Sequence, residues 1–332
     1  MRSSSLTLDA IEAARDRIAG LVVRTPSVLS PSLTEQVGVP VHLKLEHRQE
    51  TGSFKLRGAT NAVALLAESG NRAGVVAAST GNHGRALAFA AKRQGMTATI
   101  CMSRLVPDNK VSEIRRLGAA VRIVGRSQDE AQQEVLRLVA AEGLAMVPPF
   151  DDERVIAGQG TLGLEIVEDV PAVATVLIQL SGGGLAAGVA LAVKALRPSV
   201  RVIGISMARG AAMKACLDAG RPVEVEEVAT LADSLGGGIG LGNRLTFGMC
   251  RDLLDDVVLL SEEEIAEGVR HVYAQEREVV EGAGAVGVAA LLAGKVRSDG
   301  PVVAVLSGRN IDMNLHRRIV CGEWRDETER AA

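Results

Sequence analysis

The chain has 332 residues, 47% of them apolar and 23% charged, which is the composition of a folded globular protein with a large core. At this length we expect two lobes. The formal net charge is −3 and neither sign forms a long run, so the chain lacks the basic surface with which proteins bind nucleic acids.

The N-terminal part of the chain combines a helix, a strand and a second helix. Apolar residues at helical spacing from Leu8 to Ile18, after the capping residue Thr7, predict the first helix. We expect a strand over residues 41–46 and a helix from about 56 to 69. The glycine-containing turn between them lies at the entry of a helix, where backbone N–H groups are free to face a ligand.

From residue 75 onward, short apolar runs and amphipathic segments alternate. This alternation predicts parallel sheets with right-handed crossovers and a ligand cleft at the strand ends. The predicted strands are residues 75–80, 98–102, 121–124, 145–147, 175–180, 201–205, 257–260 and 302–306. The predicted helices are residues 84–93, 109–117, 128–142, 161–168, 185–195, 262–275 and 286–293, with a glycine-rich irregular segment at 236–242.

The cysteines and the N-terminal segment indicate the compartment. Cys101, Cys216, Cys250 and Cys321 form no CxxC pair, and the five histidines show no zinc-ligand spacing. Charged residues interrupt the N-terminal segment, unlike a signal peptide, and no window has the length of an uncharged membrane span. We therefore expect a cytoplasmic protein with reduced thiols and without nucleic-acid or membrane partners.

The first candidate site segment is Gly52-Ser53-Phe54-Lys55, at the entry of a predicted helix. A lysine among small and apolar residues loses solvation, which lowers its pKa and makes its amine a nucleophile that can form a Schiff base. Taken alone, Lys55 also fits a solvated surface lysine, which is the commoner case.

The second candidate segment is Ser79-Thr80-Gly81-Asn82-His83, where a predicted strand meets a helix. Backbone N–H groups at a helix start can receive an anionic group. An ordinary N-cap with a glycine turn would explain Ser79 or Thr80 and Gly81, but it would not explain Asn82 and His83. A single histidine such as His83 is more often packed or capping than catalytic.

The third candidate segment is Ser181-Gly182-Gly183-Gly184-Leu185, between a predicted strand and an apolar helix. Three glycines let the backbone wrap around a phosphate, and the helix start supplies positive potential. The segment is neither a P-loop nor a dinucleotide fingerprint. A reactive lysine, a phosphate cup and a polar loop that holds a ring are together what a pyridoxal-phosphate (PLP) site requires.

Five ordered motifs then support a family resemblance. They are GSFKLRGA at 52–59, STGNHG at 79–84, SGGGLAAG at 181–188, EGAGAVG at 281–287 and LSGRNID at 306–312. With them the chain resembles the fold-type II PLP enzymes, the group that contains threonine dehydratase and serine racemase. The resemblance runs from about Leu8 to Gly322, and it implies PLP as cofactor and a homodimer.

The resemblance also implies a fold and a division into domains. The fold is the tryptophan synthase β-like α/β fold, with two lobes that each hold a mainly parallel sheet flanked by helices. Residues 1–70 and 149–322 would form the large PLP-binding domain and residues 71–148 the small domain. Residues 323–332 are charged, and we expect them to be a disordered tail.

Carried over by position, the resemblance assigns roles around the cofactor. Lys55 would hold PLP as a Schiff base and later move the α-proton, while Asn82 would bind the ring's 3′ oxygen. Ser307 would face the pyridine nitrogen, and its hydroxyl cannot stabilise a full pyridinium, which favours rapid loss of a β-leaving group over a long-lived carbanion. The further cofactor contacts would be Phe54, Gly182, Gly183, Gly184 and Leu185.

A second set of roles concerns the substrate. The aligned residue in serine racemase is a serine that serves the opposite face, so Thr80 becomes a second candidate catalytic residue, although its methyl group makes racemisation less favoured. Asp233 would meet a second ammonium group or cap a turn. Glu281 would touch the cofactor ring region or favour a helix dipole. The expected contacts to the substrate carboxylate are Ser79, Thr80, Gly81, Asn82 and His83.

One departure from the family concerns metal binding. Ser206, Gly210 and Ala212 stand where metal-dependent relatives carry acidic residues. A hard cation prefers carboxylate oxygens, so we expect no divalent metal at this position.

Further segments indicate a narrower resemblance, to the hydroxyectoine-utilisation dehydratases. They are CMSRLVP at 101–107, GRSQDEAQ at 125–132, LADSLGGGIGL at 231–241 and RLTFGM at 244–249. This resemblance implies that the β-hydroxyl of a hydroxylated diamino acid, such as 3-hydroxy-2,4-diaminobutyrate, is removed to give a 2-oxo acid and ammonia. The alternatives are a threonine/serine dehydratase, a serine-type racemase, a PLP-binding regulator without turnover and a nucleotide-binding α/β protein. The last lacks its usual fingerprints.

Overall fold

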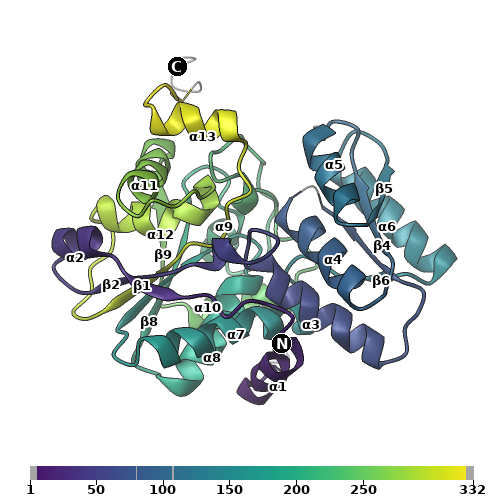
Figure 1. The fold of residues 1–332 in the computed structure, drawn as a ribbon, viewed down its shortest axis with the longest axis horizontal. Coiled ribbons are helices and arrows are strands. Elements are labelled where there is room, and N and C mark those ends of the chain that lie inside the picture. The colour runs from purple at the N-terminus through teal and green to yellow at the C-terminus, as the bar shows by residue number, and fades with distance from the viewer. Residues whose placement is uncertain (1–5, 80, 107, 327–332) are drawn as a thin grey trace.

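The computed structural model describes residues 6–79, 81–106 and 108–326, which form two sheets in two lobes (Figure 1). In the larger sheet only the edge strand β1 runs antiparallel to its neighbour. Its strands, in spatial order, are β1 (Ser27–Leu29), β2 (Val41–Lys44), β10 (Val302–Val305), β7 (Thr175–Gln179), β8 (Arg201–Met207) and β9 (Asp256–Leu260). The smaller sheet is parallel and has the order β5 (Ala120–Ile123), β4 (Ala98–Met102), β3 (Val75–Ala78) and β6 (Ala145–Met146).

Helices cover both faces of the larger sheet (Figure 1). On one side lie α11 (Glu262–Ala274) and α12 (Gly282–Leu292), and on the other α7 (Glu153–Asp169), α8 (Gly184–Leu196) and α10 (Thr246–Leu253). The remaining helices are α1 (Leu8–Ile18), α2 (Pro31–Val37), α3 (Lys55–Glu68), α4 (Asn82–Arg93), α5 (Asp108–Arg116), α6 (Gln128–Glu142), α9 (Ala212–Ala219) and α13 (Met313–Val320), with short 3₁₀ turns η1 (Glu46–Arg48) and η2 (Asp233–Leu235).

Successive residues of a central strand serve the two faces in turn. On β10, Val302 and Ala304 belong to the core on the α11 and α12 side, whereas Val303 and Val305 belong to the core on the α7 and α8 side. Side chains alternate across a strand, so a strand buried on both faces has to be apolar throughout. This explains the continuous apolar run of β10, and it confirms the predicted α/β class.

Helix α3 connects the two lobes. We assigned this segment to the large domain, yet its Leu56 and Val63 share a buried core with Val75 and Ala77 of the small sheet. Its other side packs on α7 of the large lobe. Lys55, the first residue of α3, therefore lies at the junction of the lobes, while the exact domain boundaries stay a prediction.

The helix α7 begins eight residues earlier than the predicted start at 161, because Asp152 caps it through the N–H groups of Arg154 and Val155. The glycines that weakened the helical pattern are points of close packing. A Cβ at Gly158 would lie 2.6 Å from the Cα of Gly58 on α3. Helices α2, α9, α10 and α13 were also not predicted from the sequence.

Part of the predicted tail is packed against the fold. Trp324 contacts the core on the α11 side, and Arg209 bonds Asp326. The predicted disorder is therefore wrong for residues 323–326, because an apolar ring and an ion pair fix them, and residues 327–332 lie outside the described part. Within that part, no helix is both long and apolar enough to cross a membrane.

Candidate active site

One cavity of about 570 Å³ opens where β3 of the small sheet and β7 of the large sheet end. All three predicted glycine-rich or polar segments line it, which is the arrangement expected at the carboxyl ends of parallel strands. Thr80, predicted to be catalytic and to bind substrate, lies outside the described residues. The other predicted site residues all line the cavity: Phe54, Lys55, Ser79, Gly81, Asn82, His83, Gly182, Gly183, Gly184, Leu185, Asp233 and Ser307.

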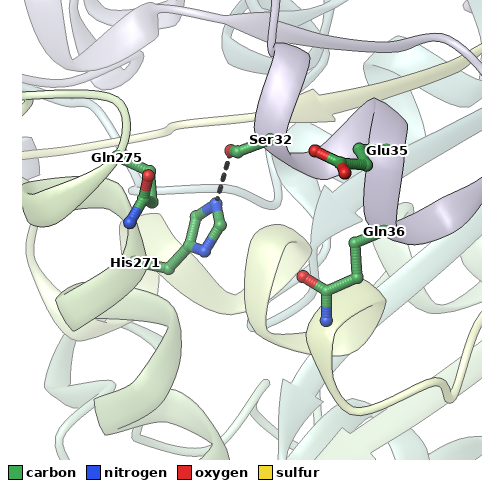
Figure 2. Close-up of a pocket in the computed structure, with 5 residues that line it drawn as sticks. All are labelled: Ser32, Glu35, Gln36, His271 and Gln275. Atoms are coloured by element: carbon green, nitrogen blue, oxygen red, sulfur yellow. Dashed lines mark hydrogen bonds between the residues drawn. The ribbon is translucent and has the colours of Figure 1, made fainter.

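A second hollow lies away from these residues, between α2 and α11 (Figure 2). It measures about 430 Å³ and contains a contact of 3.1 Å between Ser32 Oγ and His271 Nε2. Glu35, Gln36 and Gln275 complete its lining. None of the predicted site residues belongs to it, so the first cavity is the candidate active site.

Lys55 projects its amine into the cavity from the first turn of α3. Its Nζ donates to the carbonyl oxygen of Pro149 at 2.7 Å and lies 5.3 Å from the centre of the Phe54 ring. Burial lowers the pKa of Lys55 to about 8, because the charged amine loses solvation and no carboxylate compensates for it. A substantial fraction of the amine is therefore neutral and nucleophilic near neutral pH.

Asn82, the first residue of α4, is held by side chains from two other segments. Its Oδ1 accepts from Asn310 Nδ2 at 2.6 Å, and its Nδ2 donates to Glu281 Oε1 at 2.8 Å. Glu281 Oε2 also accepts from the Asn310 N–H at 3.0 Å. These bonds fix which end of the Asn82 amide is the donor, and they leave its second N–H for a ligand or for Ser234 Oγ at 3.4 Å.

Glu281 is buried within this network, and its pKa is raised to about 7. Burial is the main cause and the negative charge of Asp233 adds to it, while the hydrogen bonds from Asn82 and Asn310 oppose it. Glu281 therefore contacts the residue predicted to hold the cofactor ring, so the first of the two readings of Glu281 has the better support.

The His83 side chain is hydrogen-bonded within the protein and is not directed to a ligand. Its Nε2 donates to the Val147 carbonyl at 2.8 Å, and its buried Nδ1 has no partner among the described residues. Burial and then the charge of Lys55 lower the pKa of His83 to about 4, so the ring is neutral at pH 7. Its backbone N–H at the start of α4 remains available to an anion.

The glycine segment after β7 forms a cup with unused donors. The backbone N–H groups of Gly182, Gly183 and Gly184 donate to no acceptor in the part of the chain that is described. Gly183 has a φ of 88°, and a Cβ there would lie 2.7 Å from Met213 Cε and 2.9 Å from Cys250 Sγ. A Cβ at Gly182 would lie 2.3 Å from the Phe150 ring. Only glycine fits, and the free N–H groups suit a phosphate at the start of α8.

Ser307 approaches the cavity beside the Lys55 segment. Its carbonyl accepts from the Phe54 N–H at 3.0 Å, and Gly308 forms a β-bridge with Ser53. The Ser307 hydroxyl has no hydrogen-bond partner among the described residues. It is therefore available to a neutral or weakly basic atom of a bound ring.

Several residues of the site were not predicted from the sequence. Asn310 was inside a quoted motif, but no pattern in the sequence around it indicated its role. Pro149 and Phe150 could not be recognised from the sequence. Pro149 contributes only its backbone carbonyl, and Phe150 contributes only packing against Gly182. Arg85 and Glu227 line the cavity from surface segments whose charges looked ordinary.

Comparison with known proteins agrees with this geometry. The family model described as "Pyridoxal-phosphate dependent enzyme" matches residues 18–308. The chain belongs to this family of pyridoxal-phosphate-dependent enzymes. It is 65% identical over 98% of both chains to a putative threonine dehydratase of Sinorhizobium fredii. It is also 44% identical to the L-threonine ammonia-lyase of Thermotoga maritima, over 95% of this chain and 78% of that one.

The fold of this PLP enzyme is likewise found among solved structures. Maize serine racemase superposes with a TM-score of 0.90 at 33% identity, over 96% of this chain and 98% of that chain. The predicted fold-type II architecture is thereby confirmed, as is a PLP enzyme of the threonine dehydratase-like, ammonia-lyase kind.

The residues present fit PLP. The glycine cup offers donors to its phosphate, and the Lys55 amine with its lowered pKa suits its aldehyde. The position of Ser206, Gly210 and Ala212 carries no carboxylate, so the expectation that no divalent metal binds there stays a prediction.

The lowered pKa of Lys55 predicts how PLP uptake by the cofactor-free protein depends on pH. Only the neutral amine attacks an aldehyde, so the rate should rise with pH and become half-maximal near pH 8. Stopped-flow absorbance measures this rate, with N-acetyl-lysine as the unburied reference. A rate that keeps rising toward pH 10.5, as the reference does, would show that burial has not lowered the pKa.

Proposed function

We propose that this PLP enzyme is a dehydratase and ammonia-lyase that removes the β-hydroxyl of a hydroxy-amino acid with a cationic side chain. The preferred substrate class is a hydroxylated diamino acid such as 3-hydroxy-2,4-diaminobutyrate, formed in hydroxyectoine breakdown. The acidic lining of the cavity is the observation that carries this choice. Its acidic side chains are Asp129, Glu227, Asp233 and Glu281, the last partly neutral at pH 7 because its pKa is raised to about 7, against Lys55 and Arg85 as the basic groups.

In this proposal the substrate carboxylate binds at the start of α4. The N–H groups of Asn82 and His83 have no acceptor among the described residues, and a helix start favours an anion. Ser79 Oγ accepts from the Gly84 N–H at 3.0 Å and so shapes the turn that presents them. The predicted contacts of Gly81 and Thr80 belong to the same proposal.

Lys55 Nζ then acts as the base that removes the proton from the substrate Cα. PLP, when bound, supplies the electron sink that makes this proton acidic. The β-hydroxyl leaves as water with one proton, and Ser307, a neutral partner, does not favour a long-lived carbanion. The released enamine becomes an imine, and a second water converts it to a 2-oxo acid and ammonia.

Asp233 is proposed to bind the second ammonium group. It begins η2 at the cavity wall, and its negative charge acts on Glu281 deep in the site. A charge-assisted hydrogen bond contributes about 1.5–3 kcal/mol, which is roughly a tenfold to hundredfold effect on binding. A diamino acid would gain from this contact, whereas L-threonine would not.

The variant Asp233→Asn should lower kcat/KM for 3-hydroxy-2,4-diaminobutyrate by about 10- to 100-fold, and for L-threonine by much less. Release of 2-oxo acid and ammonia measures both. Asp252→Asn, on the exposed surface of α10, is the matched control. An equal loss on both substrates would contradict the role of Asp233 in specificity.

A threonine or serine dehydratase is the second candidate, because the relatives with high identity are named for threonine. Higher kcat/KM on L-threonine than on the diamino acid would favour it. A racemase is the third, since maize serine racemase shares the fold. Accumulation of D-serine from L-serine would identify that activity and would support Thr80 as the second catalytic group.

The homodimer and the cytoplasmic location also remain proposals. Closed pairs are the commonest assembly of such proteins, and the edge strand β1 exposes Val28 and Leu29, which a partner could cover. Sedimentation equilibrium of the holoenzyme tests the dimer, since a monomer at micromolar concentration would contradict it.

A further inference from the structure

Residues 147–150 contact three parts of the cavity. The Val147 carbonyl accepts from His83, the Pro149 carbonyl accepts from Lys55, and the Phe150 ring packs under Gly182. The segment thus joins the polar loop, the lysine and the phosphate cup. Its two next residues, Asp151 and Asp152, are both acidic and bind different backbone segments.

Asp151 binds three consecutive backbone N–H groups. Its Oδ2 accepts from Arg244 at 2.9 Å, and its Oδ1 accepts from Leu245 at 2.9 Å and from Thr246 at 3.0 Å. Thr246 is the first residue of α10, and Arg244 and Leu245 directly precede it. Leu245, at the N-cap position, supplies no side-chain cap. A carboxylate from a distant segment therefore caps this helix.

The loop that Asp151 holds forms one wall of the cavity. We call residues 236–245 the glycine loop, and its members Gly236, Gly237, Gly238 and Gly240 line the cavity. Glycines have no side chains with which to fix their position, so the loop depends on its anchors. Ile239, which is buried, is the anchor within it.

The backbone that Asp151 binds also contacts the phosphate cup, through Thr246. Thr246 is fully buried, and its Cβ lies 3.0 Å from where a Cβ of Gly183 would be. Asn243 ties the same turn together through Thr246 Oγ1 at 2.7 Å and the Phe247 N–H at 2.9 Å. The 244–246 backbone therefore connects the glycine loop to the floor of the cup.

We propose that Asp151 is a positioning residue that holds the glycine loop in register with the phosphate cup and so sets the affinity for the amino-acid substrate. The inference concerns the loop rather than its ligand, so it does not depend on which hydroxy-amino acid is bound.

The chemistry of the contact requires a carboxylate. Three N–H donors converge on two oxygens, each with more than one lone pair, and both oxygens accept. An asparagine has one acceptor oxygen, and its amide group would direct N–H groups at the backbone donors. The nearly isosteric Asp151→Asn variant should therefore lose at least one of the three hydrogen bonds to the 244–246 backbone without a change in side-chain volume.

The test compares the holoenzyme variants Asp151→Asn and Asp152→Asn. Asp152 is the matched control, because it caps α7 through Arg154 and Val155 and does not contact the glycine loop. Hydrogen exchange followed by mass spectrometry reports on residues 238–246 and on the cup at 182–188. KM and kcat are measured with L-threonine, L-serine and 3-hydroxy-2,4-diaminobutyrate, using whichever the holoenzyme turns over.

For Asp151→Asn we expect at least tenfold faster exchange in the glycine loop, a KM raised at least tenfold, and kcat changed less than threefold. PLP absorbance should be retained. For Asp152→Asn we expect a lower melting temperature with an unchanged KM. An unchanged exchange rate or an unchanged KM in Asp151→Asn would overturn the proposal. It would also be overturned if Asp151→Asn lost PLP and its melting temperature fell as much as that of Asp152→Asn, because the effect would then be a general loss of stability. Should Asp151→Asn not fold, Asp151→Ser, which keeps one acceptor, is judged by the same criteria.

Discussion

Alanine in place of Lys55 should leave a folded protein that neither retains PLP nor releases ammonia from a hydroxy-amino acid. Among the described residues that line the cavity, Lys55 carries the only primary amine. Loss of the base and of the covalent anchor together should lower the rate on the order of 10⁴-fold or more. Burial opposes the charge on this amine, so its removal should not lower the melting temperature. Absorbance, ammonia release and thermal unfolding measure the three effects.

The matched control for this variant is Lys214→Ala. Lys214 is a surface lysine that pairs with Asp218 at 2.6 Å, and its loss should leave absorbance and turnover unchanged. A Lys55→Ala protein that kept the visible band and still formed a 2-oxo acid would show that another group carries the cofactor.

Alanine in place of Arg57 should cost about 3–5 kcal/mol of the free energy of unfolding, because it removes the ion-pair partner of the buried Glu46 and leaves Lys44 as the partner of Glu165. Arg57 is 1% exposed, and it binds Glu46 through Nε and Nη2, both at 2.8 Å. It binds Glu165 through Nη1 at 2.7 Å and Nη2 at 2.9 Å. Lys44, also buried, pairs with Glu165 at 2.8 Å, so the network extends from β2 through α3 to α7. Since Arg57 follows Lys55 by two residues, the same network fixes the start of α3.

The loss caused by Arg57→Ala should grow as the pH rises from 5 to 8. In the native protein burial opposes the charge of Glu46, but the charge and hydrogen bonds of Arg57 outweigh it and hold the pKa of Glu46 below its usual value. Without Arg57, burial raises that pKa, and a group whose folded pKa is raised loses stability as pH rises through it. Urea unfolding at several pH values measures the effect.

The control for this prediction is Arg15→Ala, which breaks the exposed pair between Arg15 and Glu168 at 3.2 Å. An exposed pair contributes about 0–1 kcal/mol, so this variant should unfold almost like the wild type. A loss below about 1 kcal/mol for Arg57→Ala would mean that the carboxylates find other partners.

The class of the fold and the positions of the site were predictable because each rests on local pattern. The alternation of β7, α8 and β8 gave the parallel sheet, and glycines after a strand gave the phosphate cup. Helix α10, which has only eight residues, was not predicted, and the N–H of its first residue, Thr246, is bound by Asp151 from a segment about 95 residues earlier. A helix start is predicted from residues close to it in the sequence, so a capping side chain from a distant segment cannot be recognised in this way.

The chemistry of the site was less predictable than its location. Lys55 and Asn82 could be assigned from motifs, but their settings depend on the Pro149 carbonyl and on Asn310. A backbone carbonyl has no residue type to recognise, and any residue in place of Pro149 would offer the same oxygen. The environment of Glu281 likewise arises only when Asp233 is brought beside it in the folded protein.

The covalent position of the cofactor tests the central claim most directly. The purified holoenzyme is reduced with borohydride, digested with trypsin and analysed by mass spectrometry. The mass of a reduced phosphopyridoxyl group should appear on the peptide of residues 49–57, because trypsin does not cleave after a modified Lys55 and next cleaves after Arg57. A label on any other lysine, or a protein that takes up no label after incubation with PLP, would contradict Lys55 as the cofactor's anchor.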